Sequence, residues 1–189
     1  MTATARSVAD LTATRDARIK FLFFWGHRPG PDGRIGANCL SQWLPSPFAV
    51  DGHEFATAEH YMMWRKAILF GDTAMAPRIL AAPHPRAAKD LGGKVAGFDQ
   101  ATWNEHRVPI VVDGNLAKFG RHPEFGAFLA GTGTRVLVEA SPMDRIWGIG
   151  LAADDPAAAD PGRWRGLNLL GFALMQVRDT LSGTPATGE

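Results

Sequence analysis

The sequence predicts a mainly α-helical protein with a few short β-strands, folded as a single compact domain. Helix-length segments outnumber β-branched runs along the 189 residues, and the runs that favour strands are short. One segment, 58–70, is apolar on nearly every side, which predicts a helix buried in the core. The hydrophobic share of 46% and the chain length allow a sizeable core of this kind.

Two strands and a hairpin are expected before this central helix. Short apolar runs predict strands at Lys20–Trp25 and Asn38–Trp43. Between them, four Gly and two Pro make 26–36 a loop. The Asp51-Gly52 pair is a strong turn signal, so 48–55 is expected to form a hairpin that delivers the chain into the helix.

Helices dominate the middle of the chain, and most have a recognisable start or end. Thr57 fits an N-cap for the central helix, and Gly71 fits its C-terminal stop. Pro109 is expected to bend or divide the helix in which it lies, because proline donates no backbone hydrogen bond. Further helices are predicted at 72–82, 85–91, 99–115, 116–119 and 122–131.

The last third of the chain combines a strand, a loop and a helix. Arg135–Ala140 is short and β-branched, which predicts a strand, and Ala152–Gly162 is expected to be an exposed loop. Asn168–Leu181 predicts the last helix. The expected domain covers 19–181, with a loose tail or short helix at 1–18 before it and a disordered tail at 182–189 after it.

The composition excludes several classes of protein. A net charge of +1 gives no general attraction for nucleic acid or for an anionic membrane. Cys39 is the only cysteine, which excludes an internal disulfide and a cysteine-based zinc site. No apolar run approaches the roughly 18 residues of a membrane helix, and 1–18 lack the apolar core of a signal peptide, so a cytoplasmic location is expected.

The usual signatures of metal, nucleotide and serine-nucleophile sites are missing from the sequence. Its six His lack the i, i+4 spacing of a helical zinc site, so no metal is expected. Neither a Gly-x-Gly-x-x-Gly turn nor a phosphate loop is present, and there is no Gly-x-Ser-x-Gly elbow. Carboxylates, lysines and loops rich in Trp and Gly remain as the groups that carry chemistry.

Two ionisable residues interrupt the apolar central helix. Glu59 and Lys66 are seven residues apart, which places them on one stripe of a helix, about 10 Å apart along its axis. Buried charges cost stability unless they are paired or used, so the two residues form a candidate catalytic site. The structural alternative is that Glu59 complements the helix dipole in the first turn while Lys66 extends to water.

Three further stretches carry candidate site residues. Asp144 stands three residues before Trp147-Gly148-Ile149-Gly150, where the indole offers a flat face and the glycines let a ligand approach the backbone. A tight turn that packs its Trp into the core is the alternative there. Asn168 fits a helix N-cap or a ligand contact. Lys118, beside Phe119, fits a solvated helix face or a ligand contact.

These motifs, in this order, resemble the YbiA-like family, which is also called NADAR for its association with NAD and ADP-ribose metabolism. The resemblance runs from about Phe21 to Leu181. It rests on Thr57-Ala-Glu59-His60-Tyr61-Met62 with Lys66-Ala67, on Lys118-Phe119, on Val138-Glu139-Ala140-Ser141 with Asp144, on Trp147-Gly148-Ile149-Gly150, and on Trp164-x-Gly166-x-Asn168-Leu-Leu170-Gly171 with Leu174-Met175 and Arg178.

The resemblance implies a mainly helical fold and N-glycosidase chemistry, in which the bond between a ribose C1′ and an amine nitrogen is hydrolysed; no cofactor is expected. The implied substrate is a small phosphoribosyl or ADP-ribosyl molecule. It is either a phosphoribosylamino-pyrimidine intermediate of riboflavin biosynthesis or ADP-ribose linked to the guanine amino group of nucleic acid. A non-catalytic module that binds ADP-ribose is the alternative, and a nucleic-acid-binding protein is a third reading that the net charge disfavours.

Within the family pattern, Glu59, Lys66 and Asp144 are expected to be catalytic. Positive charge develops at C1′ as the C–N bond breaks, and a carboxylate stabilises that charge. Lys66 has two candidate roles, which are to hold phosphate or ribose oxygens or to form a Schiff base at C1′ with an amine whose pKa is lowered by its apolar neighbours. The expected substrate-binding residues are Trp147, Gly148, Gly150, Asn168, Gln42 and Trp43, together with Lys118 and Arg178 as phosphate ligands.

Overall fold

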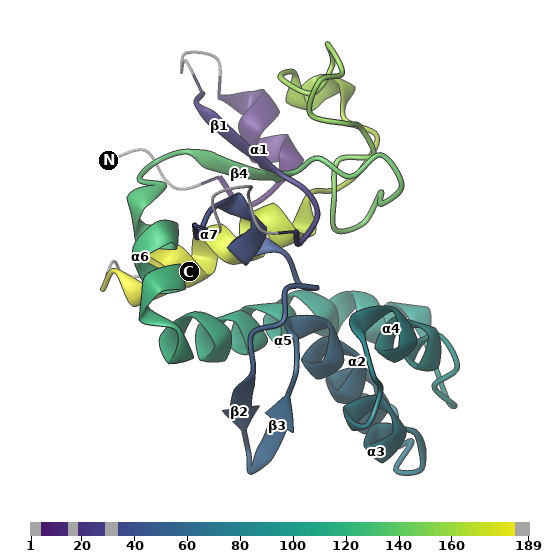
Figure 1. Ribbon diagram of the computed structural model, residues 1–189. Coiled ribbons are helices and arrows are strands. Elements are labelled where there is room, and N and C mark those ends of the chain that lie inside the picture. Colours follow the sequence, from purple (N-terminus) through teal and green to yellow (C-terminus); the bar gives the residue numbers. More distant parts are fainter. Residues whose placement is uncertain (1–4, 15–18, 29–33, 184–189) are drawn as a thin grey trace. The chain divides into compact units, whose positions relative to one another are not determined.

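The computed structural model describes residues 5–14, 19–28 and 34–183 (Figure 1). Helices account for most of the regular structure and the strands are short, so the predicted mainly α class is confirmed. The chain divides into two compact units, one within residues 1–41 and 124–189 and the other within 42–123.

The predicted domain boundaries stay a prediction. The expected N-terminal tail contains one short helix, α1 (Val8–Ala13), whose N-cap Ser7 accepts a hydrogen bond from Asp10 N. Residues 1–4 and 15–18 of the predicted N-terminal tail, 29–33 of the predicted loop and 184–189 of the predicted C-terminal tail lie outside the described residues.

The first unit is built on a two-stranded parallel sheet. β1 (Phe21–Phe24) pairs with β4 (Val136–Glu139), and both strands were expected from their apolar runs. α7 (Leu169–Leu181) packs on β4. Parallel strands end at the same edge of a sheet, so the loops that follow β1 and β4 leave it together. The other elements here are η1 (Ala37–Leu40), α6 (Pro123–Gly131) and η2 (Pro161–Arg163).

The strand predicted at Asn38–Trp43 is wrong. Residues 37–40 form the 3₁₀ turn η1, and the chain then turns again at Gln42. The side chain of Asn38 accepts a hydrogen bond from Gly36 N over 3.1 Å. Local bonds of this kind compete with the ladder of a sheet, and a short apolar run does not reveal them.

The second unit is a group of helices around α2 (Ala58–Leu69). The hairpin of β2 (Phe48–Val50) and β3 (His53–Phe55) leads into it, with positive φ values of 52° at Asp51 and 77° at Gly52, as the turn signal predicted. Thr57 caps α2 and Gly71, with a φ of +69°, follows its end, as expected. α2 packs against α3 (Met75–Leu80), α4 (Pro85–Gly92) and α5 (Gln100–Arg121).

The expected break near Pro109 is wrong in one respect, because α5 continues without division from Gln100 to Arg121. An internal proline costs a helix about 3 kcal/mol. α5 buries Ile110, Val111, Val112 and Phe119, and each such burial contributes roughly 1.5–3 kcal/mol. Packing therefore outweighs the local cost, and the two helices predicted at 99–115 and 116–119 are one.

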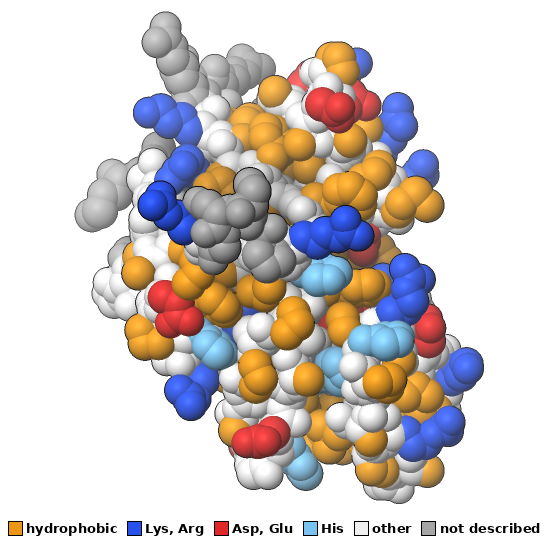
Figure 2. Space-filling model, viewed as in Figure 1, with side chains coloured by type: hydrophobic (Ala, Val, Ile, Leu, Met, Phe, Trp, Pro, Cys, Tyr) orange, Lys and Arg blue, Asp and Glu red, His pale blue; other side chains and the backbone are white. Residues whose placement is uncertain are grey.

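The described helices and the face shown in Figure 2 were compared with what a membrane-spanning element or a uniformly charged surface would require. No helix in the described part of the chain combines the length and hydrophobicity needed to cross a bilayer. On the face shown in Figure 2, Lys and Arg side chains are interspersed with acidic, His and apolar side chains. This mixed surface agrees with the net charge of +1.

Candidate functional site

The first turn of α2 holds Glu59 between a main-chain and a side-chain contact. Glu59 N donates to Gln42 O over 3.0 Å, which satisfies a backbone donor that has no partner within the helix. The indole Nε1 of Trp43 donates to Glu59 Oε2 over 3.2 Å. Glu59 is only 3% exposed. The turn that carries Gln42 and Trp43 thus fixes a buried carboxylate at the start of the central helix.

Gln42 is itself anchored by α5. Its Nε2 donates to Asn115 Oδ1 over 3.0 Å, and Asn115 Nδ2 donates back to Gln42 Oε1 over 3.3 Å. Lys118 lies one turn further along α5 and is fully buried, with Nζ 5.2 Å from the centroid of the Phe119 ring. The solvated-face alternative for Lys118 is therefore wrong.

Lys66 lies two turns after Glu59 on α2, among aromatic rings. Its Nζ donates to Gly92 O over 2.9 Å and lies 4.2 Å from the ring centroid of Phe98 and 5.5 Å from that of Trp103. Burial lowers the pKa of Lys66 below that of an ordinary lysine. Among the described residues, no carboxylate forms an ion pair with it.

Gly92 sets the distance between Lys66 and the end of α4. A Cβ atom on Gly92 would collide with the Sδ and Cγ atoms of Met63 on α2. Any larger residue here would force the Met63 side chain to move, and the close approach of the two helices brings the carbonyl of Gly92 to the lysine. Glu59 and Lys66 share a helix but have different neighbours, a Trp N–H for the first and a carbonyl and two rings for the second.

In the first unit, Asp144 organises the loop that follows β4. Its Oδ1 accepts hydrogen bonds from Ile146 N over 2.8 Å and from Trp147 N over 2.7 Å. Gly148 is buried against Glu139 O, and Gly150 has a φ of +67°. Trp147 lies in this tight loop and is half-buried. The tight turn that was the alternative and the predicted site residues therefore occupy the same loop.

Asn168 occupies the N-cap position of α7, as one of the two alternatives expected, but its side chain makes no capping hydrogen bond. The residue has a φ of 53°, in the left-handed region that Asn tolerates. Its Oδ1 accepts from Glu139 N over 3.0 Å and its Nδ2 donates to Leu137 O over 2.9 Å. The buried amide thus pairs with the main chain of β4 as a neighbouring strand would.

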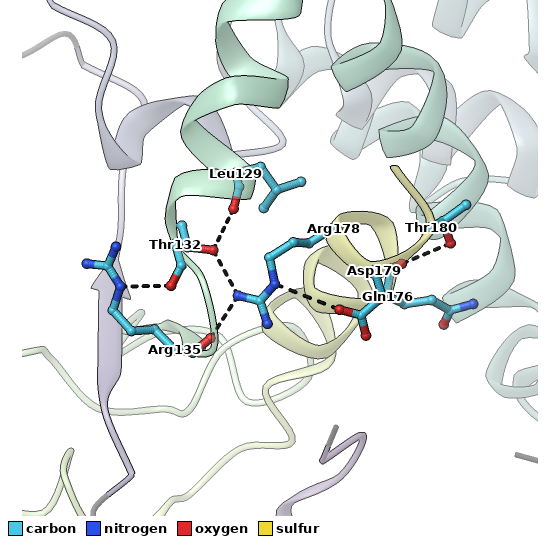
Figure 3. A network of polar contacts seen from close by, with 7 residues as sticks. All are labelled: Leu129, Thr132, Arg135, Gln176, Arg178, Asp179 and Thr180. Atoms are coloured by element: carbon cyan, nitrogen blue, oxygen red, sulfur yellow. Dashed lines mark hydrogen bonds and ion pairs between the residues drawn. The ribbon is translucent and has the colours of Figure 1, made fainter. Parts of the chain in front are cut away.

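Arg178, predicted as a phosphate ligand, belongs to a network inside the first unit (Figure 3). Its Nη1 donates to Thr132 Oγ1 over 2.8 Å and to Arg135 O over 2.9 Å, and its Nε lies 3.9 Å from Asp179 Oδ1. Arg135 precedes β4, whereas Asp144 follows it. Arg178 therefore holds the opposite end of the strand from the Asp144 loop.

The predicted residues thus form two groups, one in each unit. Gln42, Trp43 and Glu59 are joined by hydrogen bonds in the second unit, which also carries Lys66 and Lys118. The first unit groups the remaining predicted residues, except Arg178, around the carboxyl end of β4: Asp144, Trp147, Gly148, Gly150 and Asn168.

Two features of the structure had no signal in the sequence. An open hollow of about 420 Å³ lies in the first unit, lined by Trp25, Arg28, Arg34 and Ile35, among others. A second feature is the pair of cations, Arg86 and Lys89, beside the Trp43 ring. Within the described residues, no group of three or more His, Cys, Asp or Glu side chains is placed to hold a metal ion.

Comparisons with known proteins bear on this geometry. The family model of the NADAR domain matches residues 23–182. An N-glycosidase of Acanthamoeba polyphaga mimivirus is 39% identical over 165 residues, which cover 85% of this chain and 95% of that protein. An N-glycosidase of Nostoc punctiforme is 32% identical over 143 residues, or 76% of this chain and 85% of that protein.

A solved structure shares the fold. The NMR structure of the Escherichia coli protein YbiA aligns with a TM-score of 0.64, covering 91% of this chain and 94% of that one. The sequence identity in this alignment is 24%. At that identity, the structural similarity supports a shared fold and nothing further.

Proposed function

Because this chain belongs to the NADAR domain family and is a hydrolase of N-glycosyl bonds, as its relatives are, we propose that it cleaves the C1′–N bond of a phosphorylated ribose. The candidate substrates are a phosphoribosylamino-pyrimidine of riboflavin biosynthesis and ADP-ribose linked to the guanine amino group of nucleic acid. Both would be met in the cytoplasm, the location that the sequence predicts. The observation that carries the proposal is the buried carboxylate of Glu59. It accepts a hydrogen bond from Trp43 and lies on the same helix as Lys66.

Glu59 is proposed to stabilise the positive charge that develops at C1′. The carboxylate is nearly inaccessible to water, and Coulomb attraction is stronger in such surroundings than in solution. The Trp43 N–H donates to Oε2, one of the two carboxylate oxygens, and this hydrogen bond fixes the orientation of the carboxylate. A preorganised anion of this kind favours a cationic transition state over a neutral substrate.

Lys66 is proposed to act as an amine nucleophile. Its lowered pKa increases the fraction of neutral amine, and the described residues supply no carboxylate partner that would keep it charged. The amine adds to C1′ of the open-chain imine form of the substrate. Both lysine hydrogens pass to the leaving nitrogen, which departs as a free amine, and a lysine imine remains. Water hydrolyses that imine, which releases the ribose phosphate and restores the amine.

The predicted residues of the first unit are proposed to have three kinds of role. Trp147 offers its indole to the base or sugar, and Gly148 and Gly150 allow close approach of backbone. Asp144 keeps its proposed catalytic role, although its Oδ1 is engaged by the loop. The polar atoms of Asn168 and Arg178 bind protein groups, so these two are proposed to act by holding the ends of β4.

A paired turnover assay tests the function. The purified protein is incubated in one tube with the phosphoribosylamino-pyrimidine and in another with a DNA oligomer that carries ADP-ribosyl-guanine. Release of the free base in the first tube alone marks a metabolite-clearing enzyme, and release of ADP-ribose in the second alone marks a nucleic-acid hydrolase. Turnover of neither would reject the proposed substrates and favour a binding module for ADP-ribose.

A further inference from the structure

Two cationic side chains of α4 converge on the ring of Trp43. The guanidinium carbon of Arg86 lies 5.7 Å from the ring centroid, and Nζ of Lys89 lies 6.0 Å from it. The two residues are three positions apart in one helix, so they share a face. Both side chains are exposed, and neither makes a hydrogen bond or ion pair with a residue that the structure describes.

Surface packing alone does not account for this pair. A cation over an exposed aromatic ring contributes about 0.5–1 kcal/mol, and one cation is sufficient for that. Two like charges on one helix face repel each other, and the energy of this repulsion is similar in size to the attraction between two opposite charges at the same spacing. The carboxylate bound at the same indole, Glu59, accepts the Nε1–H at the edge of the ring. The two positive charges thus lack an ion-pair partner among the described side chains, and an external anion would reduce their repulsion.

We propose that Arg86 and Lys89 bind a phosphate group of the substrate beside Glu59. This inference rests on the proposed function for the identity of the ligand. Both candidate substrates carry a phosphate on the carbon next to the ribose ring, at the opposite end of the sugar from C1′. Trp43 lies beside a proposed partner for each of these two substrate groups. Its N–H binds the Glu59 carboxylate, which is proposed to act at C1′, and its ring lies beside the two cations that are proposed to bind the phosphate.

The two cations differ in what they supply. A guanidinium binds two oxygens of one phosphate at once, whereas an ammonium acts as a compact point charge. Both side chains are long and exposed, and contact with the indole limits the positions that they sample before a ligand arrives. A phosphate ester placed here would be held without a metal or a glycine-rich loop, which the sequence lacks.

Binding of ribose 5-phosphate, measured by calorimetry, tests the site without any turnover. The double variant Arg86→Ala/Lys89→Ala is expected to lose about tenfold to hundredfold in affinity, the effect of removing two charge-assisted contacts. The variant Arg86→Lys/Lys89→Arg keeps both charges and is expected to bind within about threefold of the wild type. Arg121→Ala, which removes an exposed cation of α5, is the matched control and should bind as the wild type does.

Kinetics on the substrate that is turned over separate binding from catalysis. In the double alanine variant KM should rise by a similar factor while kcat stays within about twofold. Unchanged affinity and KM in that variant, or failure of the wild type to bind ribose 5-phosphate, would overturn the proposal. If the wild type binds ribose 5-phosphate through these residues but cleaves neither substrate, the proposed function fails and the phosphate site stands.

Discussion

Trp43 and Glu59 are joined by a hydrogen bond of 3.2 Å from the indole Nε1 to the carboxylate Oε2. The residue before Trp43, Gln42, accepts the backbone N–H of Glu59 over 3.0 Å. A turn 16 residues upstream thus fixes both the main chain and the side chain of the central carboxylate. Trp43 is therefore a positioning residue for Glu59 as well as the ring on which Arg86 and Lys89 converge.

Replacing Trp43 by Phe keeps an aromatic ring but removes the donor to Glu59. We expect kcat to fall about tenfold to hundredfold, because a hydrogen bond to a buried charged group is worth about 1.5–3 kcal/mol. KM should stay within about threefold, since the ring remains. The control is Trp164→Phe, which removes an indole bond of 2.8 Å to Ala158 O in the first unit. Equal kcat values in the two variants would contradict the positioning role.

Lys66 should form a covalent adduct that reduction traps. Borohydride added during turnover is expected to fix the ribose phosphate on the wild type as a stable amine, seen as a mass increase on the peptide that contains Lys66. Lys66→Ala should give no adduct. Activity should rise with pH at a midpoint below that of an ordinary lysine, because burial lowers the pKa of Lys66 and the neutral amine is the reactive form. An active wild type without any adduct would leave Lys66 only its alternative role, that of holding substrate oxygens.

Substitution by Ala is expected to destabilise the protein at Gly92 but not at the neighbouring Gly93. Gly92→Ala places a methyl group against Met63 and moves the carbonyl that binds Lys66, so we expect the free energy of unfolding to fall by about 1–3 kcal/mol. Gly93→Ala is the control, because its φ is −69° and its new methyl group would meet Asp90 O at 3.5 Å. Urea denaturation measures both. Equal loss of stability in the two variants would show that the contact between α4 and α2 is not specific to Gly92.

His60 predicts a loss of stability in mild acid. Its Nε2 contacts Ala82 O over 3.0 Å and its Nδ1 contacts Thr57 Oγ1 over 2.8 Å, so the neutral ring donates to the carbonyl and accepts from the hydroxyl. Burial is the largest cause of a pKa below the ordinary value of a histidine. A lowered folded-state pKa means that the unfolded chain binds the proton more tightly. This contribution to stability is complete above about pH 6.5 and is lost as the pH falls through the folded-state pKa.

Unfolding at pH 7.5 and at pH 5.5 measures that effect. The difference between the two free energies should shrink in His60→Gln, which cannot gain a proton. His106→Gln changes an exposed His of α5 and should keep the difference that the wild type shows. An unchanged difference in His60→Gln would assign the acid sensitivity to other groups.

Signals that act within a few residues were sufficient to predict much of the fold. The hairpin at 48–55 and the cap and stop of α2 came from turn and capping residues, whose effect is local. Pro109 shows the limit of such reasoning, because burial along the whole of α5 outweighs one unfavourable residue. Asn38 shows another, because it lies in a 3₁₀ turn and makes a local bond to Gly36 where a strand was expected.

The contacts of the candidate site depend on long-range packing, which one sequence does not reveal. Gln42 and Asn115 are 73 residues apart in the sequence and are joined by a hydrogen bond, and neither segment contains a signal that predicts this pair. Asn168 has the sequence signature of a helix cap, yet its amide binds a strand 29 and 31 residues earlier. Motifs therefore supplied the residue types of the candidate site, which stay a prediction, whereas the hydrogen-bond partners of these residues could not be predicted.

The turnover of Glu59→Gln tests the central claim most directly. The substitution keeps the size of the side chain and removes its charge, and Glu54→Gln in β3 is the control at an exposed carboxylate. We expect kcat to fall by about a hundredfold or more in Glu59→Gln, with the affinity for ribose 5-phosphate within about threefold of the wild type and full activity in Glu54→Gln. A folded Glu59→Gln variant whose kcat stays within about threefold of the wild type would contradict the account.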